Sequence, residues 1–167
     1  MNIDELRESI DNADICLIGI GEEFSAEENS LNDLQAAYNK IHSLIKDKNY
    51  FVVSICDDKI IFTSELEYDR ITAPYTLPED ATEDKQWEKY MKWLSCTLNK
   101  KLLIIELGAS LNKPQVIRWP FEKTVMINNK AQLIRINETM PNIPGEIKDK
   151  SVSIKANAVD FVLESDC

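Results

Sequence analysis

Glycine, proline, cysteine and histidine are all scarce in this chain, and the first three scarcities each exclude a class of protein or site. Its 167 residues include one histidine, four glycines, six prolines and four cysteines. So little glycine and proline excludes a collagen-like or low-complexity disordered chain. The cysteines lie far apart without a Cys-x-x-Cys pair, which suits reduced thiols better than a disulfide framework. We therefore expect no zinc site.

Long apolar runs and positive charge are also lacking. No hydrophobic stretch approaches the ~18 residues that a membrane span needs, and the charged opening residues lack the apolar region of a signal peptide. Lys and Arg number 19 against 29 Asp and Glu, a net charge of −10, and the basic residues are dispersed. Such a surface repels a phosphate backbone. We expect a cytoplasmic protein with neither a membrane nor a nucleic acid as partner.

What the chain does contain is typical of a globular protein. Hydrophobic residues make up 44% and charged residues 29%. A chain of 167 residues can bury a sizeable core but is too short for two ordinary domains. We expect one domain over residues 1–167.

Short apolar runs alternate with helical patterns throughout the chain. Aliphatic runs predict buried strands at 14–18, 50–55, 102–107, 132–136 and 151–154. Apolar spacings of three and four predict helices at 4–12, 31–48, 82–98 and 156–163, and one kinked helix or two short ones within 115–127. The alternation predicts an α/β fold, a three-layer, Rossmann-like open sheet that is mostly parallel, with helices on both faces.

Particular residues refine these helices. Ser30 is expected to cap the second helix, with Asp33 three residues on. Thr82 is expected to cap the third helix. The core-facing residues of that third helix are expected to be Trp87, Met91, Leu94 and Leu98. Its aromatics also look exposed on successive faces, namely Trp87, Tyr90 and Trp93.

The first candidate binding segment is Gly19-Ile20-Gly21, where the first strand is expected to end. It holds two glycines of a Gly-x-Gly-x-x-Gly fingerprint, but Phe24 stands where the third belongs. The segment is therefore either a phosphate-binding turn or a tight strand-to-helix turn. Glu22 and Glu23 would repel a bound pyrophosphate unless they point to solvent.

The second candidate is Gly108-Ala109-Ser110, which follows five apolar residues. Small residues let backbone N–H groups approach a ligand, and the serine adds a hydroxyl. The alternative is that these residues simply begin a loop.

Two further polar positions follow. Arg118 can pair with a phosphate or, as we favour, with Glu106 or Glu122. Asn137 and Glu138 stand at the carboxyl end of the fourth expected strand, where ligand contacts gather in open α/β sheets. An asparagine at a strand end is equally typical of a turn.

Acidic and imidazole groups offer weaker candidates. Asp57 and Asp58 follow the second expected strand and could bind a metal, although a solvated turn fits better. His42 lies inside the second expected helix, as a surface or half-buried residue rather than a general base.

Four segments resemble, in order and spacing, the nucleotide-binding segments of the sirtuin family, which has a DHS-like NAD/FAD-binding fold. They are Leu17 to Gly21, Val52 to Asp58, Glu106 to Leu111 and Leu133 to Asn137. Ile117 to Glu122 is also similar to a segment of bacterial sirtuin-like proteins. The set spans nearly the whole chain.

The resemblance implies roles for the matching positions. The glycines of the first turn match a loop that covers dinucleotide phosphates, and Asp58 matches a residue facing the nicotinamide ribose. Gly108 and Ser110 match a loop that takes phosphate and ribose, and Asn137 matches an asparagine on the adenosine side.

The chain also departs from the family pattern. Cys56 replaces the asparagine of an Asn-x-Asp segment, and the histidine region reads Ala-Pro-Tyr-Thr at 73–76. The substrate loop is reduced to 22–30, and a helix replaces the zinc module. Without the histidine base, deacylation should lose on the order of 100- to 10,000-fold in rate.

These observations leave three hypotheses. The first is a degenerate sirtuin-like domain with a cleft for NAD or ADP-ribose and no deacetylase activity. The second is an interaction or regulatory protein with a vestigial cleft, which binds a protein partner or forms a homo-oligomer. The third is an NAD-dependent deacylase or an NAD-cleaving hydrolase that uses Asp58 or a glutamate.

Overall fold

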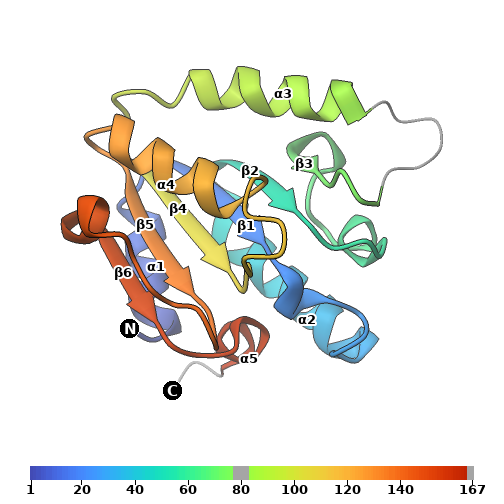
Figure 1. Cartoon of the computed structure of the whole chain (residues 1–167). Helices are drawn as coiled ribbons and strands as arrows, with labels where there is room; N and C mark the ends of the chain where they lie inside the picture. The colour runs from blue at the N-terminus through green and yellow to red at the C-terminus, as the bar shows by residue number, and fades with distance from the viewer. Residues whose placement is uncertain (77–82, 165–167) are drawn as a thin grey trace.

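The computed structural model of the chain describes residues 1–76 and 83–164. Within them, six strands form one sheet in the order β3-β2-β1-β4-β5-β6, and all neighbours run parallel (Figure 1). The strands are β1 (Ile15–Ile20), β2 (Asn49–Ser54), β3 (Ile71–Thr72), β4 (Leu102–Leu107), β5 (Gln132–Ile136) and β6 (Ser151–Ile154). The predicted α/β fold is confirmed, and its strand order is that of doubly wound, Rossmann-like sheets.

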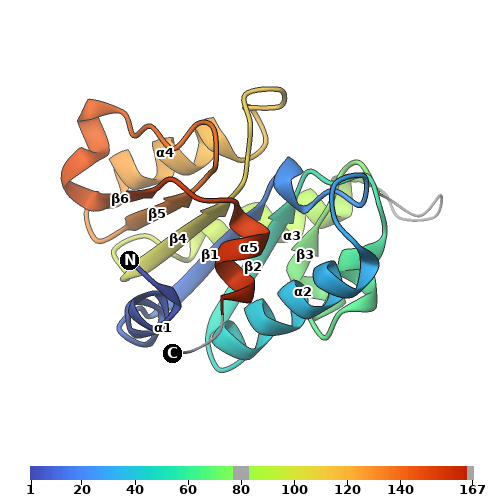
Figure 2. The same ribbon diagram turned by 90° about the horizontal axis from the view of Figure 1, so that it is seen from below.

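Helices cover both faces of the sheet (Figures 1 and 2). One face carries α1 (Ile3–Asp11), α2 (Leu31–Ile45) and α5 (Ala158–Leu163), and the other carries α3 (Glu83–Ser95) and α4 (Arg118–Ile127). Short 3₁₀ turns are η1 (Glu22–Phe24), η2 (Ile60–Thr63), η3 (Tyr68–Arg70) and η4 (Gly145–Lys150). Each helical layer shares an apolar core with the sheet, which is why β1 and β4 are buried at every position.

Gly19 shows how closely these layers pack. A Cβ on Gly19 would lie 2.6 Å from Cε2 of Phe121 and 2.8 Å from Cγ2 of Ile117. Glycine at this position therefore lets α4 approach β1. The strand continues through Gly19 and Ile20 rather than ending at Gly19, so that part of the prediction is wrong. Ile20 is itself fully buried in the core beneath α2 and α5.

The start of α2 and the position of His42 on that helix agree with the sequence signals, whereas α2 and α3 end three residues earlier than predicted, at Ile45 and Ser95. Ser30 caps α2, accepting a hydrogen bond from the Asp33 N–H at 3.1 Å, as predicted. His42 is half-buried on α2, with its Nδ1 3.2 Å from Oε2 of Glu65, which also agrees with the prediction. Thr82, the expected cap of α3, lies outside the described residues.

The expectation of exposed aromatics on α3 is wrong. Tyr90 is fully buried, and Trp87 and Trp93 are partly buried beside it. The Phe51 ring of β2 lies 5.3 Å from the Tyr90 ring and 5.6 Å from the Trp93 ring, centroid to centroid. Burial of these large rings sets the face that α3 turns toward the sheet.

That choice of face overturns part of the predicted core. Met91 is 40% exposed, because Tyr90 and Trp93 take the inward positions of α3, and Leu98 is 55% exposed. Leu98 also lies beyond the end of α3 at Ser95. Two other differences are the start of α4 at Arg118 and the short edge strand β3, which the sequence pattern did not predict.

Three of the four cysteines fall within the described residues, and all three are free thiols. Cys16 and Cys56 are buried, and burial raises the pKa of each to about 12. Within residues 1–76 and 83–164, no helix is long and apolar enough to cross a bilayer.

Candidate functional site

The carboxyl ends of β1 and β4 form the switch point of the sheet. β1 leads to α2 on one face, and β4 leads to α4 on the opposite face. In open α/β sheets, ligands bind in the crevice at this place. Here the loops that follow the strands meet directly: the Gly21 N–H donates to the Leu107 carbonyl at 2.8 Å, and the Glu23 N–H donates to the Gly108 carbonyl at 3.2 Å.

Two of the predicted glycines are required by this contact between loops. A Cβ on Gly21 would lie 2.3 Å from both the nitrogen and the Cα of Ala109. Gly108 has a φ of +65°, and its Cβ would lie 2.4 Å from the Cβ of Glu23. Gly21 and Gly108 therefore stand where another part of the protein, rather than open space, meets them.

Glu22 and Glu23 do not point to solvent. Glu22 accepts two hydrogen bonds from Ser110, one from its N–H and one from its hydroxyl, both at 2.8 Å. Glu23 accepts from the N–H groups of Glu138 at 2.8 Å and Ala158 at 2.6 Å. Burial raises the pKa of the Glu23 carboxyl, against the lowering effect of these two N–H donors. Both glutamates thus take part in the predicted site, in a role that the sequence reasoning missed.

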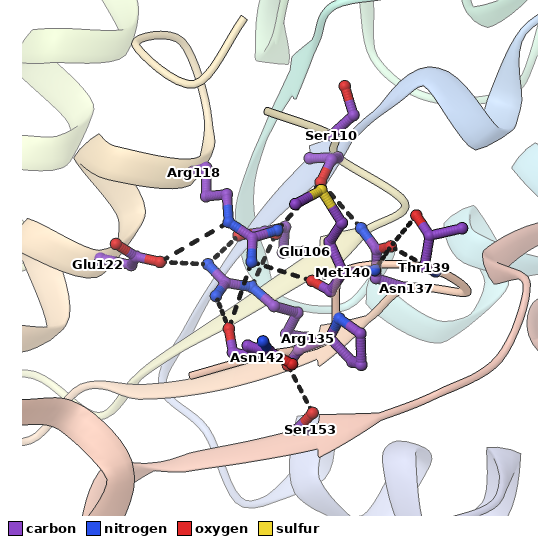
Figure 3. Close-up of polar contacts among 12 residues, drawn as sticks. Glu106, Ser110, Arg118, Glu122, Arg135, Asn137, Thr139, Met140, Asn142 and Ser153 are labelled. Carbon is purple, nitrogen blue, oxygen red and sulfur yellow. Dashed lines mark hydrogen bonds and ion pairs between the residues drawn. The ribbon is translucent and has the colours of Figure 1, made fainter. Parts of the chain in front are cut away.

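Asn137 organises the loop after β5. Its side-chain amide donates to the Ala109 carbonyl at 2.8 Å, and its carbonyl oxygen accepts from the N–H groups of Thr139 at 3.1 Å and Met140 at 2.8 Å (Figure 3). The residue is 2% exposed. The turn-forming interpretation of Asn137 is therefore confirmed, and its amide joins the loops of β4 and β5.

A buried ionic cluster lies under α4 beside these loops (Figure 3). The Arg135 guanidinium donates to both oxygens of Glu106, at 2.8 and 2.9 Å, and to Glu122 at 2.8 Å. Arg135 and Glu106 are fully buried. Burial by itself would lower the pKa of Arg135. The hydrogen bonds and the negative charge of Glu106 outweigh this effect, so the pKa of the guanidinium is raised.

Arg118 belongs to the same cluster. Its Nη1 lies 3.7 Å from Glu106 Oε1, and its Nε lies 4.0 Å from Glu122 Oε1, so the predicted internal ion pair is confirmed. Arg118 also donates to the carbonyls of Ala109 at 3.3 Å and Met140 at 2.9 Å. Its guanidinium therefore holds the loops after β4 and β5 together.

Asp58 lies on the β2 side of this edge. Its carboxylate accepts from the Ala26 N–H at 3.3 Å and from the Ile60 N–H at 3.1 Å, which ties the acidic loop (residues 22–29) to the start of η2. The neighbouring Cys56 thiol donates to the Gly21 carbonyl at 3.4 Å. These contacts agree with the turn interpretation of Asp58 favoured above.

The structure brings together most of the predicted site residues but not all. Those that meet at the carboxyl edge are Gly21, Gly108, Ala109, Ser110, Arg118, Asn137 and Glu138. Gly19 and Ile20 are core residues, and Asp58 contacts the acidic loop. Arg135 was missed, although an arginine among the buried aliphatic residues of a strand is a sequence signal for a buried ion pair.

The amino ends of the strands carry none of the predicted site residues. A hollow of about 570 Å³ lies at the opposite edge, where Lys101, Lys130 and Gln132 stand beside the start of β4 and β5. In the part of the chain that the structure describes, no group of three or more His, Cys, Asp or Glu side chains is arranged to hold a metal ion.

Comparison with known proteins gives distant similarities. No family model matches the chain. It is 25% identical over 89 residues, 53% of its length, to a protein ADP-ribosyltransferase of Staphylococcus aureus (strain Mu50). It is 38% identical over 76 residues, 42% of its length, to a probable bifunctional ADP-ribose hydrolase/ADP-ribosyltransferase of Fusarium oxysporum f. sp. cubense. The matches span 28% and 12% of these relatives, so the chain is similar to a part of proteins named for ADP-ribose chemistry.

Proposed function

We propose that this chain is a sirtuin-like domain that binds NAD or ADP-ribose at the carboxyl edge of β1, β4 and β5 and lacks deacetylase activity. The observation that carries the proposal is the convergence of four donors at the switch point: the N–H groups of Ser110, Glu138 and Ala158 and the Ser110 hydroxyl. Backbone N–H groups gathered in this way suit phosphate oxygens. The relatives named for ADP-ribose chemistry support an ADP-ribose-containing ligand.

The four donors are of the kind that binds phosphate oxygens. All four donors hold carboxylate oxygens at 2.6–2.8 Å, so this edge already accommodates two anionic groups. The hydrogen bonds made by the Asn137 side chain and the Arg118 guanidinium hold the loops in place around these donors. In this proposal the residues of the chain bind and orient the nucleotide rather than carry out chemistry on it.

The position of the single histidine supports binding without deacylation. His42 lies in the last turn of α2, a helix that runs back from the carboxyl edge toward the start of β2. Its Nδ1 is engaged by Glu65 at 3.2 Å. A general base must come within hydrogen-bond reach of the proton that it removes. His42 belongs to the opposite end of the sheet and has no such access to a ligand at the switch point.

Thermal unfolding with NAD, ADP-ribose or ATP tests the proposal. A ligand at 100 times its dissociation constant adds about 2.7 kcal/mol to stability, which corresponds to a rise of several degrees in Tm. Ser110→Tyr should abolish the rise by filling the donor cradle. Gln132→Tyr, at the opposite edge, is the matched control and should preserve it. No rise with any nucleotide, or an equal rise in both variants, would refute this site.

A second candidate function rests on a different surface. Trp119, Met126 and Ile127 on α4 are 58%, 45% and 60% exposed and share one side of the helix. Exposed apolar groups of this kind suit a protein partner or a second copy of the chain. Light scattering of the wild type and of Trp119→Lys tests self-association: a dimer that dissociates in the variant supports it, and a monomer in both excludes it.

A further inference from the structure

We propose that Glu22 and Glu23 form an internal anion plug: their carboxylates occupy the donors that ligand phosphates need, and a nucleotide binds only when they withdraw. This inference rests on the proposed function, and it concerns the regulation of that same site. The plug is defined as the side chains of Glu22 and Glu23 on the η1 turn.

The geometry of the plug is that of a bound anion. Each carboxylate uses both of its oxygens, and together they engage four donors from three separate segments of the chain. Glu22 bridges the N–H and hydroxyl of Ser110, whereas Glu23 bridges the N–H groups of Glu138 and Ala158. Charge-assisted bonds of this length are the strong ones in proteins, and phosphate oxygens form the same kind.

Phosphate and plug cannot share the site. Both are anionic, and a diphosphate placed on these donors would stand within a few ångströms of two carboxylates. Each donor N–H has one hydrogen to give, so a phosphate oxygen must replace a carboxylate oxygen on it. Binding is therefore an exchange of one anion for another.

The turn that carries the plug allows this exchange. Phe24 anchors the turn, because it is fully buried and its ring lies 5.5 Å from the Tyr38 ring, centroid to centroid. Glu22 and Glu23 are each only partly buried, so their side chains can rotate toward solvent while Phe24 stays in place. Gly108 leaves the space for Glu23, since a Cβ there would lie 2.4 Å from the Glu23 Cβ.

Glu23 is held at an energetic cost that favours its release. Burial raises its pKa, and the charges of Glu28 and Glu138 act in the same direction, against the two N–H donors. A ligand that takes over these donors lets Glu23 regain its solvation. The plug therefore weakens the affinity for a phosphate-bearing ligand without blocking the site.

Removing the plug charge tests the proposal. We expect ADP-ribose to bind Glu22→Gln and Glu23→Gln several-fold tighter than the wild type, and the double variant at least tenfold tighter, by isothermal titration calorimetry. Adenosine, which has no phosphate, should bind all of them equally. Glu27→Gln is the matched control. Glu27 is exposed on the same acidic loop, and its substitution removes the same charge. Equal gains in Glu27→Gln would show general charge repulsion and overturn the plug.

Amide NMR shifts provide a readout that needs no nucleotide. In the free protein, Glu22→Gln should shift the Ser110 amide signal, and Glu23→Gln should shift those of Glu138 and Ala158, whereas Glu27→Gln should shift none of them. These single variants also keep the test decisive if the double variant fails to fold. Unmoved signals would overturn the plug.

A titration with inorganic pyrophosphate separates the two proposals. If the double variant binds pyrophosphate but no nucleotide, the plug stands and the proposed function fails. If ADP-ribose binds the wild type and the plug variants equally, the proposed function stands and the plug is overturned. If no variant binds either probe, both are overturned, and the glutamates serve only to join the loops.

Discussion

The buried pair of Arg135 and Glu106 gives the sharpest test of what holds the candidate site together. Both side chains are 0% exposed, and two hydrogen bonds of 2.8 and 2.9 Å join them. Among the residues that the structure describes, Glu106→Leu leaves the Arg135 guanidinium with Glu122, which is 14% exposed, as its one carboxylate partner. Breaking a buried pair by removing one partner costs about 3–5 kcal/mol. Against a typical total of about 5–15 kcal/mol, this is a large share of stability.

The double variant Glu106→Leu/Arg135→Met should recover much of that loss. Replacing a whole buried pair with apolar side chains is often neutral or stabilising, because two desolvation costs disappear with the attraction. Arg118 and Glu122 remain, with Nε and Oε1 4.0 Å apart. We therefore expect the double variant to lie within about 2 kcal/mol of the wild type.

Urea unfolding of the wild type, both single variants and the double variant measures these terms. Lys89→Met is the matched control: the ion pair of Lys89 with Asp69 is also 2.8 Å long, but the side chains are 56% and 79% exposed. An exposed pair of this kind is worth less than about 1 kcal/mol. A loss below about 1 kcal/mol for Glu106→Leu, or a double-variant loss equal to the sum of the single losses, would refute the reasoning.

Three further predictions concern single positions. Gly19→Ala should lose about 1–3 kcal/mol of unfolding free energy, because its Cβ would overlap the Phe121 ring; Gly145→Ala, with nothing within 4 Å, should lose none, and equal losses would contradict this. Ser30→Ala should lower the unfolding free energy by about 1 kcal/mol in urea unfolding, because it removes the N-cap of α2, and an unchanged midpoint would exclude that role. The pKa of Glu23 is raised in the folded state, so this group stabilises the fold at pH values below its ordinary pKa of 4.5, and that stabilisation is lost as the pH rises through the folded-state pKa. The unfolding free energy of the wild type relative to Glu23→Gln should therefore fall as the pH rises across that range. A rise instead would show that the burial cost is not dominant.

The strand positions were readable from the sequence because they depend on local pattern. The prediction at 102–107 coincides with β4, a continuous aliphatic run that stays apolar because helices cover both of its faces. The closing helix predicted at 156–163 is also present as α5, although it begins at Ala158. The two-residue β3 was not predicted, since it is too short to carry a period of its own.

Helix faces were less predictable than helix existence. α3 offers two overlapping apolar stripes, one through Met91 and one through Tyr90 and Trp93. Spacing alone does not choose between them. Contact with Phe51 of β2 does, because the larger rings bury more area against the sheet.

What the sequence by itself determined is the alternation of strands and helices, the glycine turns at the ends of two strands and the position of the candidate edge. Only the tertiary structure decided what fills that edge. Glu22 meets Ser110 from 88 residues away, and Glu23 meets Glu138 and Ala158 from 115 and 135 residues away. Whether a carboxylate beside a glycine turn repels a phosphate or takes its place depends on which hydrogen-bond donors face the carboxylate. Those donors are brought to the carboxyl edge by the parallel order of the strands rather than by residues close in sequence.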